Sequence, residues 1–191
     1  MKSLLLFKMR VIMKLALKSL LAASLLSSTA LYANVLEGHR VGLGFNSTSI
    51  DDIAFDGKYS TSGLTLAYGY DINDIIGINV SLNKGSGTDF PFDIDTSTFK
   101  FDTDIGYTFH MQNASIKPYG VLGFAKFKEE ASAFGLDAWK WDDSTIFVGI
   151  GTRATFNHHF YTDLRLDFIN LKESGDNIFA DQFSFTVGYK F

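Results

Sequence analysis

Residues 182–191, QFSFTVGYKF, carry an apolar side chain at every second position. The apolar positions are Phe183, Phe185, Val187, Tyr189 and Phe191, and the residues between them are Gln, Ser, Thr, Gly and Lys. Side chains of a β-strand point alternately to its two faces. This period of two therefore predicts a terminal strand with one apolar face and one polar face.

The same alternation recurs upstream of this stretch, from residue 35 onward, and predicts seven more strands. They are expected around residues 41–45, 64–70, 76–82, 99–109, 116–127, 146–156 and 164–168. In the fifth of the eight strands, the apolar residues between 119 and 124 are nearly contiguous. Either set of alternate positions could face outward there, so the register of this strand is left open.

The segments between the predicted strands alternate in length. Long connections are expected at 47–58, 84–96, 128–143 and 172–181, and short ones at 71–74, 111–115 and 157–159. Long external loops, short periplasmic turns and an even strand number are typical of barrels in the bacterial outer membrane. The fold class predicted is all-β: an eight-stranded antiparallel up-and-down transmembrane β-barrel with both termini on the periplasmic side.

Seven charged residues fall on the faces opposite the apolar side chains. They are Lys100, Asp102, Asp104, Arg153, Asp163, Arg165 and Asp167. A soluble sandwich or lipocalin would expose this face to water, whereas a membrane barrel would turn it inward. Glycines that alternate with large aromatic residues favour the membrane barrel, whose narrow lumen small and charged side chains would fill. We interpret the seven as a lumen charge network that fills the barrel, with proton or ion passage as the alternative.

The first 33 residues form a basic start followed by an apolar stretch and small residues up to Ala33. This order is typical of a cleaved signal peptide, which gives residues 1–33 as signal and 34–191 as the barrel domain. A membrane anchor helix is the alternative, but the apolar stretch is short for one and rich in Ser and Thr. Met13 begins a more compact signal of its own, so translation could start at Met1 or Met13.

Composition excludes several classes of site. The chain has no cysteine, which excludes disulfides, a thiol nucleophile and a lipoprotein anchor. Five of the 17 basic residues lie in residues 1–33, which leaves 12 against 21 acidic residues in the mature domain. The four predicted long loops hold 14 acidic and 5 basic residues, so the excess negative charge belongs to the loops. An acidic domain disfavours nucleic acid as a partner.

An enzyme acting on outer-leaflet lipid would need a catalytic histidine near the external loops. The four histidines, His39, His110, His158 and His159, are all expected at the periplasmic end. No metal site is expected, because His158 and His159 have no evident third ligand. We therefore expect no enzyme activity and no cofactor.

The stretch PYGVLG at 118–123 and the closing VGYKF at 187–191 resemble small eight-stranded outer-membrane barrels of the OmpA-like, OmpX/Ail and opacity-type groups. The resemblance covers the whole mature chain. It implies a location in the bacterial outer membrane, contact with outer-membrane lipid and lipopolysaccharide, and a terminal strand read by the barrel-assembly machinery. The residues of that assembly signal would be Phe183, Phe185, Val187, Tyr189 and Phe191. For the Ail-like and opacity branches it also implies external loops that touch host surfaces.

Trp139 and Trp141 lie in the third predicted long loop between acidic residues. They are candidates for a loop contact with a host surface ligand, since exposed Trp is a strong binding anchor. The alternative, equally weighted, is that they sit at the membrane interface. The sequence favours a monomeric, non-enzymatic barrel that gives envelope structure and surface contact through acidic loops. The alternatives are an adhesin, a porin-like channel for small solutes and a lipid-modifying enzyme.

Overall fold

The computed structural model describes residues 38–52, 57–173 and 176–191, so the predicted signal peptide lies outside the described residues. The described elements are all strands. They are β1 (Gly38–Asp52), β2 (Gly57–Asp71), β3 (Ile76–Asp89), β4 (Phe92–Gly106), β5 (Phe109–His110), β6 (Ala114–Ala133), β7 (Leu136–Phe156), β8 (Phe160–Glu173) and β9 (Asp176–Lys190). Within these ranges no apolar helix of membrane-spanning length occurs.

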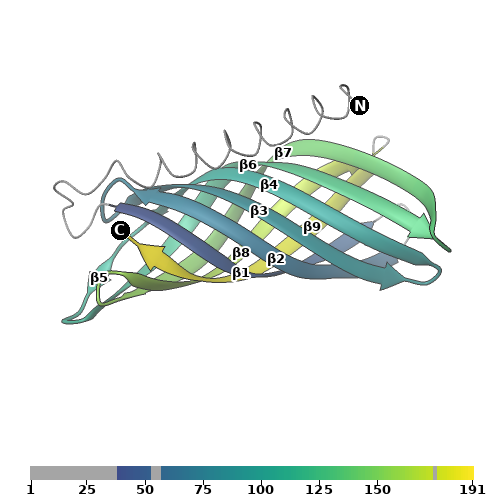
Figure 1. Ribbon diagram of the computed structural model, residues 1–191. Helices are drawn as coiled ribbons and strands as arrows, with labels where there is room; N and C mark the ends of the chain where they lie inside the picture. The colour runs from purple at the N-terminus through teal and green to yellow at the C-terminus, as the bar shows by residue number, and fades with distance from the viewer. Residues whose placement is uncertain (1–37, 53–56, 174–175) are drawn as a thin grey trace, which may run out of the picture. The chain divides into compact units, whose positions relative to one another are not determined.

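The strands form one closed antiparallel barrel (Figure 1). Apart from β4 and β5, strands that are neighbours in sequence pair with each other, and β1 pairs with β9 from Arg40 opposite Lys190 onward. β4 and β5 both pair with β6, so they are one strand interrupted at Tyr107 and Thr108. The predicted eight-stranded up-and-down barrel is confirmed, because the pairing of β1 with β9 closes the sheet.

The two ends of the barrel differ in their connections. We call one the terminal end, because β1 begins and β9 ends there; its turns are 72–75, 111–113 and 157–159, close to the short turns predicted. We call the other the hairpin end. There Phe90 and Pro91 join β3 to β4, and Phe134 and Gly135 join β6 to β7. Phe134 and Gly135 have φ of 53° and 79°, as a tight two-residue hairpin turn requires.

The prediction of long loops at the hairpin end is wrong. Almost all the described residues of 47–58, 84–96, 128–143 and 172–181 belong to strands, including Gly85, Ser86 and Gly87, which lie in β3. β6 and β7 are the longest strands, with 20 and 21 residues. The acidic residues assigned to loops therefore lie largely on barrel walls that continue beyond the apolar part of the strands.

The error has a physical cause, because the alternation changes phase within the strands. In β6, Leu122 and Phe124 face outward and are exposed, but the next outward residues are Lys126 and Lys128. Phe127, between the two lysines, is fully buried inside the barrel. The strand continues while its apolar residues move from the outer face to the inner face.

The structure also fixes the register of β6, which the sequence left open. Tyr119, Val121 and Phe127 are buried and point into the barrel, whereas Leu122 and Phe124 point outward. The run of apolar residues is ambiguous because β6 has large side chains on both faces near the phase change.

An apolar band covers the outer face of the barrel towards the terminal end. Its members are exposed although large and hydrophobic: Leu43, Phe45, Leu64, Leu66, Leu82, Phe99, Phe101, Leu122, Phe124, Ile146, Val148, Leu164, Phe168, Phe183 and Phe185. Near the terminal end the exposed aromatics are Tyr107, Phe109, Phe156, Phe160, Tyr189 and Phe191. These side chains form an aromatic belt of the kind found where outer-membrane barrels meet the membrane interface, and Tyr68 and Tyr70 at this end are half exposed.

A polar collar surrounds the barrel between the apolar band and the hairpin end. Most of its outward residues are polar, with Phe179 on β9 as an exposed apolar exception. The polar ones are Ser47, Ser62, Lys84, Ser86, Asp95, Lys126, Lys128, Glu130, Lys140, Asp142, Ser144, Asn170, Lys172 and Asp181. Inside the collar lies a distal core of buried apolar side chains: Ile50, Phe127, Phe147, Ile169, Leu171, Ile178 and Ala180. The wall is therefore apolar outside in one half of the barrel and apolar inside in the other.

Candidate functional site

The inner face of the terminal half carries a lumen network of paired charges. It contains six cations, Arg40, Lys100, Lys117, Arg153, Arg165 and Lys190, and five carboxylates, Asp71, Asp102, Asp104, Asp163 and Asp167. All seven residues proposed from the sequence lie in it. The structure adds Arg40, Asp71, Lys117 and Lys190, and every member lies on a strand position that points inward.

One group of the lumen network lies nearest the terminal end. Arg40 on β1 and Lys190 on β9 bind the two oxygens of Asp71, at 3.0 and 2.8 Å. Arg153 Nε on β7 donates to Asp163 Oδ2 on the adjacent strand β8 at 2.7 Å, and its Nη1 reaches across the lumen to 3.5 Å from Asp71 Oδ1. The group therefore joins β1, β2, β7, β8 and β9 around the mouth of the barrel.

Asp104 lies at the centre of this group and has no exposed side-chain surface. Lys117 Nζ donates to its Oδ1 at 2.6 Å, and Arg153 approaches its Oδ2 at 3.4 Å. Arg40 Nη2 lies 3.7 Å from the same Oδ2. One buried carboxylate thus has three cations around it, which is the arrangement that makes a buried charge tolerable.

A second group of the lumen network lies deeper in the barrel. Arg165 binds both oxygens of Asp102 through its two terminal nitrogens, at 3.1 and 2.8 Å, and its Nε donates to Asp167 at 2.7 Å. Lys100 Nζ donates to Asp167 Oδ2 at 2.5 Å and to Gln182 Oε1 at 2.6 Å. The paired forks of Arg165 and Asp102 fix the geometry of β8 against β4.

Neutral side chains connect the two groups and extend the second. Asn79 Nδ2 donates to Asp102 Oδ1 at 2.8 Å and to Asp104 Oδ2 at 3.0 Å, so it joins one group to the other. Gln182 Nε2 donates to Thr48 Oγ1 at 2.8 Å on the side facing the hairpin end. The hydrogen bonds therefore run continuously across the terminal half of the lumen.

Phe147 lies at the boundary between the lumen network and the distal core. The ammonium of Lys100 and the guanidinium of Arg165 lie 5.8 and 5.5 Å from its ring centroid, within the range of cation–π attraction. Phe147 is 1% exposed and packs with Ile169 and Ala180. The ring of Phe147 thus contacts charged side chains on one side and apolar side chains on the other.

Trp139 and Trp141 do not lie in a loop as predicted, because both belong to β7 and lie on its inward positions. Trp141 packs on Phe127 with ring centroids 5.4 Å apart, at the edge of the distal core. Trp139 Nε1 donates to Glu129 Oε1 at 3.2 Å, and Tyr59 Oη donates to Glu129 Oε2 at 2.6 Å. Trp141 therefore packs at the inner edge of the hairpin end, whereas Trp139 is 40% exposed, and contact of the two tryptophans with a surface ligand stays a prediction.

Little free space is left inside the barrel. The cavity lined by Arg40, Asn79 and Lys100 has a volume of about 40 Å³, and so does the one at the terminal mouth beside Asp71 and His158. Such volumes hold one or two water molecules. Around these two cavities, the lumen is occupied by the paired side chains of the network.

The histidines lie at the terminal end, as the topology predicts. His39 is at the start of β1, His110 is in β5, and His158 and His159 are in the turn before β8. His110 Nε2 lies 3.1 Å from Asp74, and His159 Nδ1 lies 3.1 Å from the backbone oxygen of Lys190. Among the described residues no group of three metal-binding side chains occurs.

The members of the lumen network that sequence reasoning missed lie near strand ends. Arg40, Asp71, Lys117 and Lys190 each stand one residue from an outward apolar or aromatic position. Continuing the period of two to the ends of the strands would have found them. The ion-pair partner of each charged residue could not be found from the sequence around it. Lys117 and Asp104, for example, meet because β6 pairs with β4.

The residues predicted as an assembly signal lie on the outer face of the closing strand. Phe183, Phe185, Val187, Tyr189 and Phe191 are all exposed. The backbone N–H of Phe191 donates to the His39 carbonyl at 2.9 Å, which secures the end of the chain to β1. Recognition of this face by the assembly machinery stays a prediction.

Comparison with known proteins supports the barrel. The model of the outer membrane protein beta-barrel domain matches residues 19–191. No curated protein sequence matches the chain. Ail, the attachment invasion locus protein of Yersinia pestis, has a similar structure, with 20% identity, TM-score 0.59, and coverage of 82% of this chain and 100% of that one.

Two further solved structures share the fold. Neisserial surface protein A has 18% identity and TM-score 0.62, over 81% of this chain and 97% of that one. The outer membrane protein OprG of Pseudomonas aeruginosa has 15% identity and TM-score 0.54, over 82% of this chain and 97% of that one. At these identities the likeness is one of fold.

Proposed function

Because this chain belongs to the outer membrane protein beta-barrel domain family, we propose that it is a non-enzymatic barrel of the bacterial outer membrane with a closed lumen. Its role is to give the envelope structure and to present the collar and the hairpin end to the surroundings. The observation that carries the proposal is the lumen network, in which each of the five carboxylates has a cation within 4.0 Å.

The orientation follows from the outer surface. The apolar band and the aromatic belt lie towards the terminal end, and the connections that the structure describes beyond them there are short turns. The collar extends past the band at the opposite end. Short turns belong to the periplasmic side of such barrels, so the collar and the hairpin end lie outside the cell.

Conductance in planar bilayers tests the closed lumen. The wild-type barrel is expected to leave the current at the bilayer background, because ions would have to displace side chains that are already paired. Heat-modifiable migration of the same sample on a gel controls for folded protein. Stepwise conductance from a sample that passes this control would favour the channel alternative.

Absence of enzyme activity rests on the placement of the titratable groups. The histidines lie at the terminal end, and the buried carboxylates are held by cations. After incubation with the reconstituted barrel, outer-membrane lipids should have unchanged masses, as measured by mass spectrometry. A lipid product that depends on folded barrel would contradict this.

Attachment to another surface is a second candidate, favoured by the tips of two neighbouring hairpins. Phe90, Phe134 and Leu136 are 87%, 85% and 74% exposed beyond the collar. Ail, which shares the fold, has been crystallised with the heparin analogue sucrose octasulfate. The exposed carboxylates beside these tips, Asp89, Asp93 and Asp137, disfavour a sulfated ligand there, so a contact through the tips would be apolar.

A cell-binding assay tests attachment. Replacing Phe90, Phe134 and Leu136 together by Ser should abolish binding if the tips carry it. The matched control replaces Asn170, Lys172 and Asp181, three exposed collar residues on β8 and β9, by Ser. Equal binding of both triple variants and the wild type would exclude the tips as the contact.

A further inference from the structure

The strand β7 extends past the end of its pairing with β8. It pairs with β6 along its whole length, from Leu136 to Phe156, whereas its pairing with β8 stops at Phe147. β6 and β7 continue together towards the hairpin end (Figure 1). Among the described residues, β7 therefore has a neighbouring strand on one side only between 136 and 146. We call its other side the free edge of β7.

A side chain takes the place of main-chain pairing where β7 and β8 separate. Asp143 Oδ2 accepts the backbone N–H of Lys172 on β8 at 2.8 Å, and Asp143 Oδ1 accepts the backbone N–H of Ser144 at 2.7 Å. The N–H of Ser144 therefore points away from β6. Because the backbone groups of successive residues point to alternate sides of a strand, those of Asp142 and Lys140 also point to the free edge.

Burial along β7 agrees with an uncovered edge. On β6 the inward residues Glu129 and Ala131 are 1% and 4% exposed. The residues opposite them on β7 are Trp141 and Trp139, and Trp139 is 40% exposed although it occupies an inward position. From 136 to 140 every side chain of β7 is exposed, whichever face it lies on. A strand added at the free edge would cover them.

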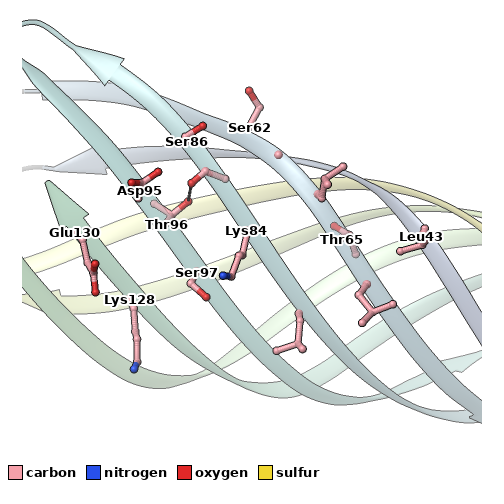
Figure 2. Close-up of a pocket in the computed structure, with 15 residues that line it drawn as sticks. Leu43, Ser62, Thr65, Lys84, Ser86, Asp95, Thr96, Ser97, Lys128 and Glu130 are labelled. Atoms are coloured by element: carbon pink, nitrogen blue, oxygen red, sulfur yellow. Dashed lines mark hydrogen bonds between the residues drawn. The ribbon is translucent and has the colours of Figure 1, made fainter. Parts of the chain in front are cut away.

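The neighbouring strand β4 differs, because it is paired on both sides up to its end. Phe92, its first residue, lies opposite Asp89 on β3 and Ala133 on β6. The outer surface beside it carries a groove of about 890 Å³, whose side chains include Asp95 and Glu130 (Figure 2). The backbone of β4 is already bound by its two neighbours, so this surface offers a ligand mainly side chains. The free edge of β7 offers main-chain donors and acceptors as well.

Three exposed charged side chains lie along the free edge: Asp137, Lys140 and Asp142. Lys140 pairs with Glu130 on β6. Asp142 pairs with Lys126 on β6 at 3.4 Å. Asp137 has no ion pair among the described residues. A chain that docks here with a cation beside Asp137 would therefore be favoured over one with a carboxylate there.

We propose that the free edge of β7 binds an extended segment of another protein, which adds a strand to the sheet. An unpaired edge presents main-chain donors and acceptors at the spacing of a β-strand, so an extended backbone is the ligand that matches it. The segment carries apolar residues on the side of Trp139 and Trp141, and a lysine or arginine on the side of Asp137. The inference deepens the surface contact proposed above and rests on the orientation given there, which places this edge outside the cell.

Peptide binding to the purified barrel tests the proposal without reference to the cell. The probe is a labelled synthetic peptide in which Val and Lys alternate, added to barrels in phosphatidylcholine nanodiscs, with empty nanodiscs as background. Fluorescence anisotropy should show saturable binding to the wild type. A peptide with Glu in place of Lys should bind more weakly, because it meets Asp137 with like charge. A copy of the probe N-methylated along its backbone should also bind more weakly, because it cannot donate hydrogen bonds.

Two substitutions at Lys140 separate the main chain from the side chain. Lys140→Pro removes the N–H at the free edge and leaves the pairing with β6 in place, as proline allows at a sheet edge. Lys140→Ser removes the same ammonium but keeps the N–H, so it is the reference. Lys140→Pro should bind the probe about ten-fold more weakly than Lys140→Ser, the effect of one lost main-chain hydrogen bond. Lys128→Ser, at an exposed collar position on β6, is the matched control and should bind as the wild type does.

Amide hydrogen exchange of the wild type is a second measurement that needs no variant. The amides of Lys140 and Asp142 should exchange quickly in the unbound barrel and more slowly with the probe bound. The amide of Trp141 points to β6 and should exchange slowly in both states.

Three outcomes would overturn the proposal. Equal affinity of the two Lys140 variants, both shown to be folded by heat-modifiable migration, would mean that the N–H at the edge is not used. Unchanged exchange at Lys140 and Asp142 with saturating probe would place the peptide elsewhere. A dimer of the barrel that Lys140→Pro dissociates would assign the edge to a second copy. None of these results affects the closed lumen, which the conductance measurement tests separately.

Discussion

The two halves of the barrel are built from the same strands and have opposite interiors. In the terminal half the wall is apolar outside, and six cations and five carboxylates fill the lumen. In the hairpin half the wall is polar outside, and Phe127, Phe147 and Ile169 fill the lumen. The solvent beside the wall, lipid in one half and water in the other, decides which face must be apolar.

The polar lumen is therefore a consequence of the surrounding membrane rather than evidence for a pore. A wall whose apolar side chains face lipid leaves its polar positions facing inward, where charges must be paired. Once the wall leaves the membrane, the apolar side chains return to the inside, as in a soluble protein. The two interiors should therefore respond differently to truncation.

Arg153→Met should have the largest effect on stability. Arg153 is 5% exposed and serves Asp71, Asp104 and Asp163, so its loss leaves buried carboxylates without their cation. The expected loss is about 3 to 5 kcal/mol in the free energy of unfolding, measured by urea titration in lipid vesicles. Adding Asp163→Asn should recover part of it, and a double variant no more stable than Arg153→Met would contradict the pairing.

Phe127→Ala tests the distal core in the other half. Phe127 is fully buried, and its removal should cost about 3 kcal/mol through lost burial and the cavity left behind. Lys126→Ala changes the adjacent outward residue of the collar and should leave the urea midpoint unchanged. If the two variants had equal midpoints, the inside of the collar would not be a packed core.

A charge placed on the outer wall locates the boundary between the halves. Leu164 and Asn170 are both exposed on β8, one within the apolar band and the other in the collar. Leu164→Lys should cost about 2 to 3 kcal/mol because the ammonium enters hydrocarbon, whereas Asn170→Lys should cost nothing measurable. Similar losses at both positions would mean that the band extends to residue 170.

Glu129→Gln should have the smallest effect. The carboxylate accepts hydrogen bonds from Tyr59 and Trp139, and an amide has only one acceptor oxygen to replace them. We expect a loss of about 1 kcal/mol and a red shift of tryptophan fluorescence as Trp139 loosens. Glu130→Gln, on the outer face, is the control; a shift of equal size there would assign the signal to charge rather than to the hydrogen bond.

The sequence predicts the terminal half well, because one rule governs it. Apolar side chains face lipid at every second position, and this alone predicts the eight strands, the short turns and the inward position of Lys100 and Arg165. The resemblance of residues 187–191 to closing strands of outer-membrane barrels agrees with the family match. The partners of the charged residues could not be predicted, since they depend on the stagger of strands around the closed barrel.

The hairpin half was predicted poorly, because its apolar side chains lie on the inner face of the strands instead of the outer face. At the boundary Phe124 faces outward and Phe127 faces inward, so the alternation is lost over a few residues and resembles the start of a loop. Trp139 and Trp141 were placed in a loop for this reason. Applying the period of two separately on each side of Lys126 recovers one continuous strand.

The accessibility of spin labels along β6 tests whether the outer wall changes from apolar to polar where it leaves the membrane. The chain has no cysteine, so single cysteines can be placed at Leu122, Phe124, Lys128 and Glu130, four outward positions of one strand. In reconstituted barrels, oxygen concentrates in lipid and should speed the relaxation of labels at 122 and 124. A water-soluble nickel chelate should speed the relaxation of labels at 128 and 130. Oxygen-dominated relaxation at all four positions would contradict the inversion, because the collar would then lie within the membrane.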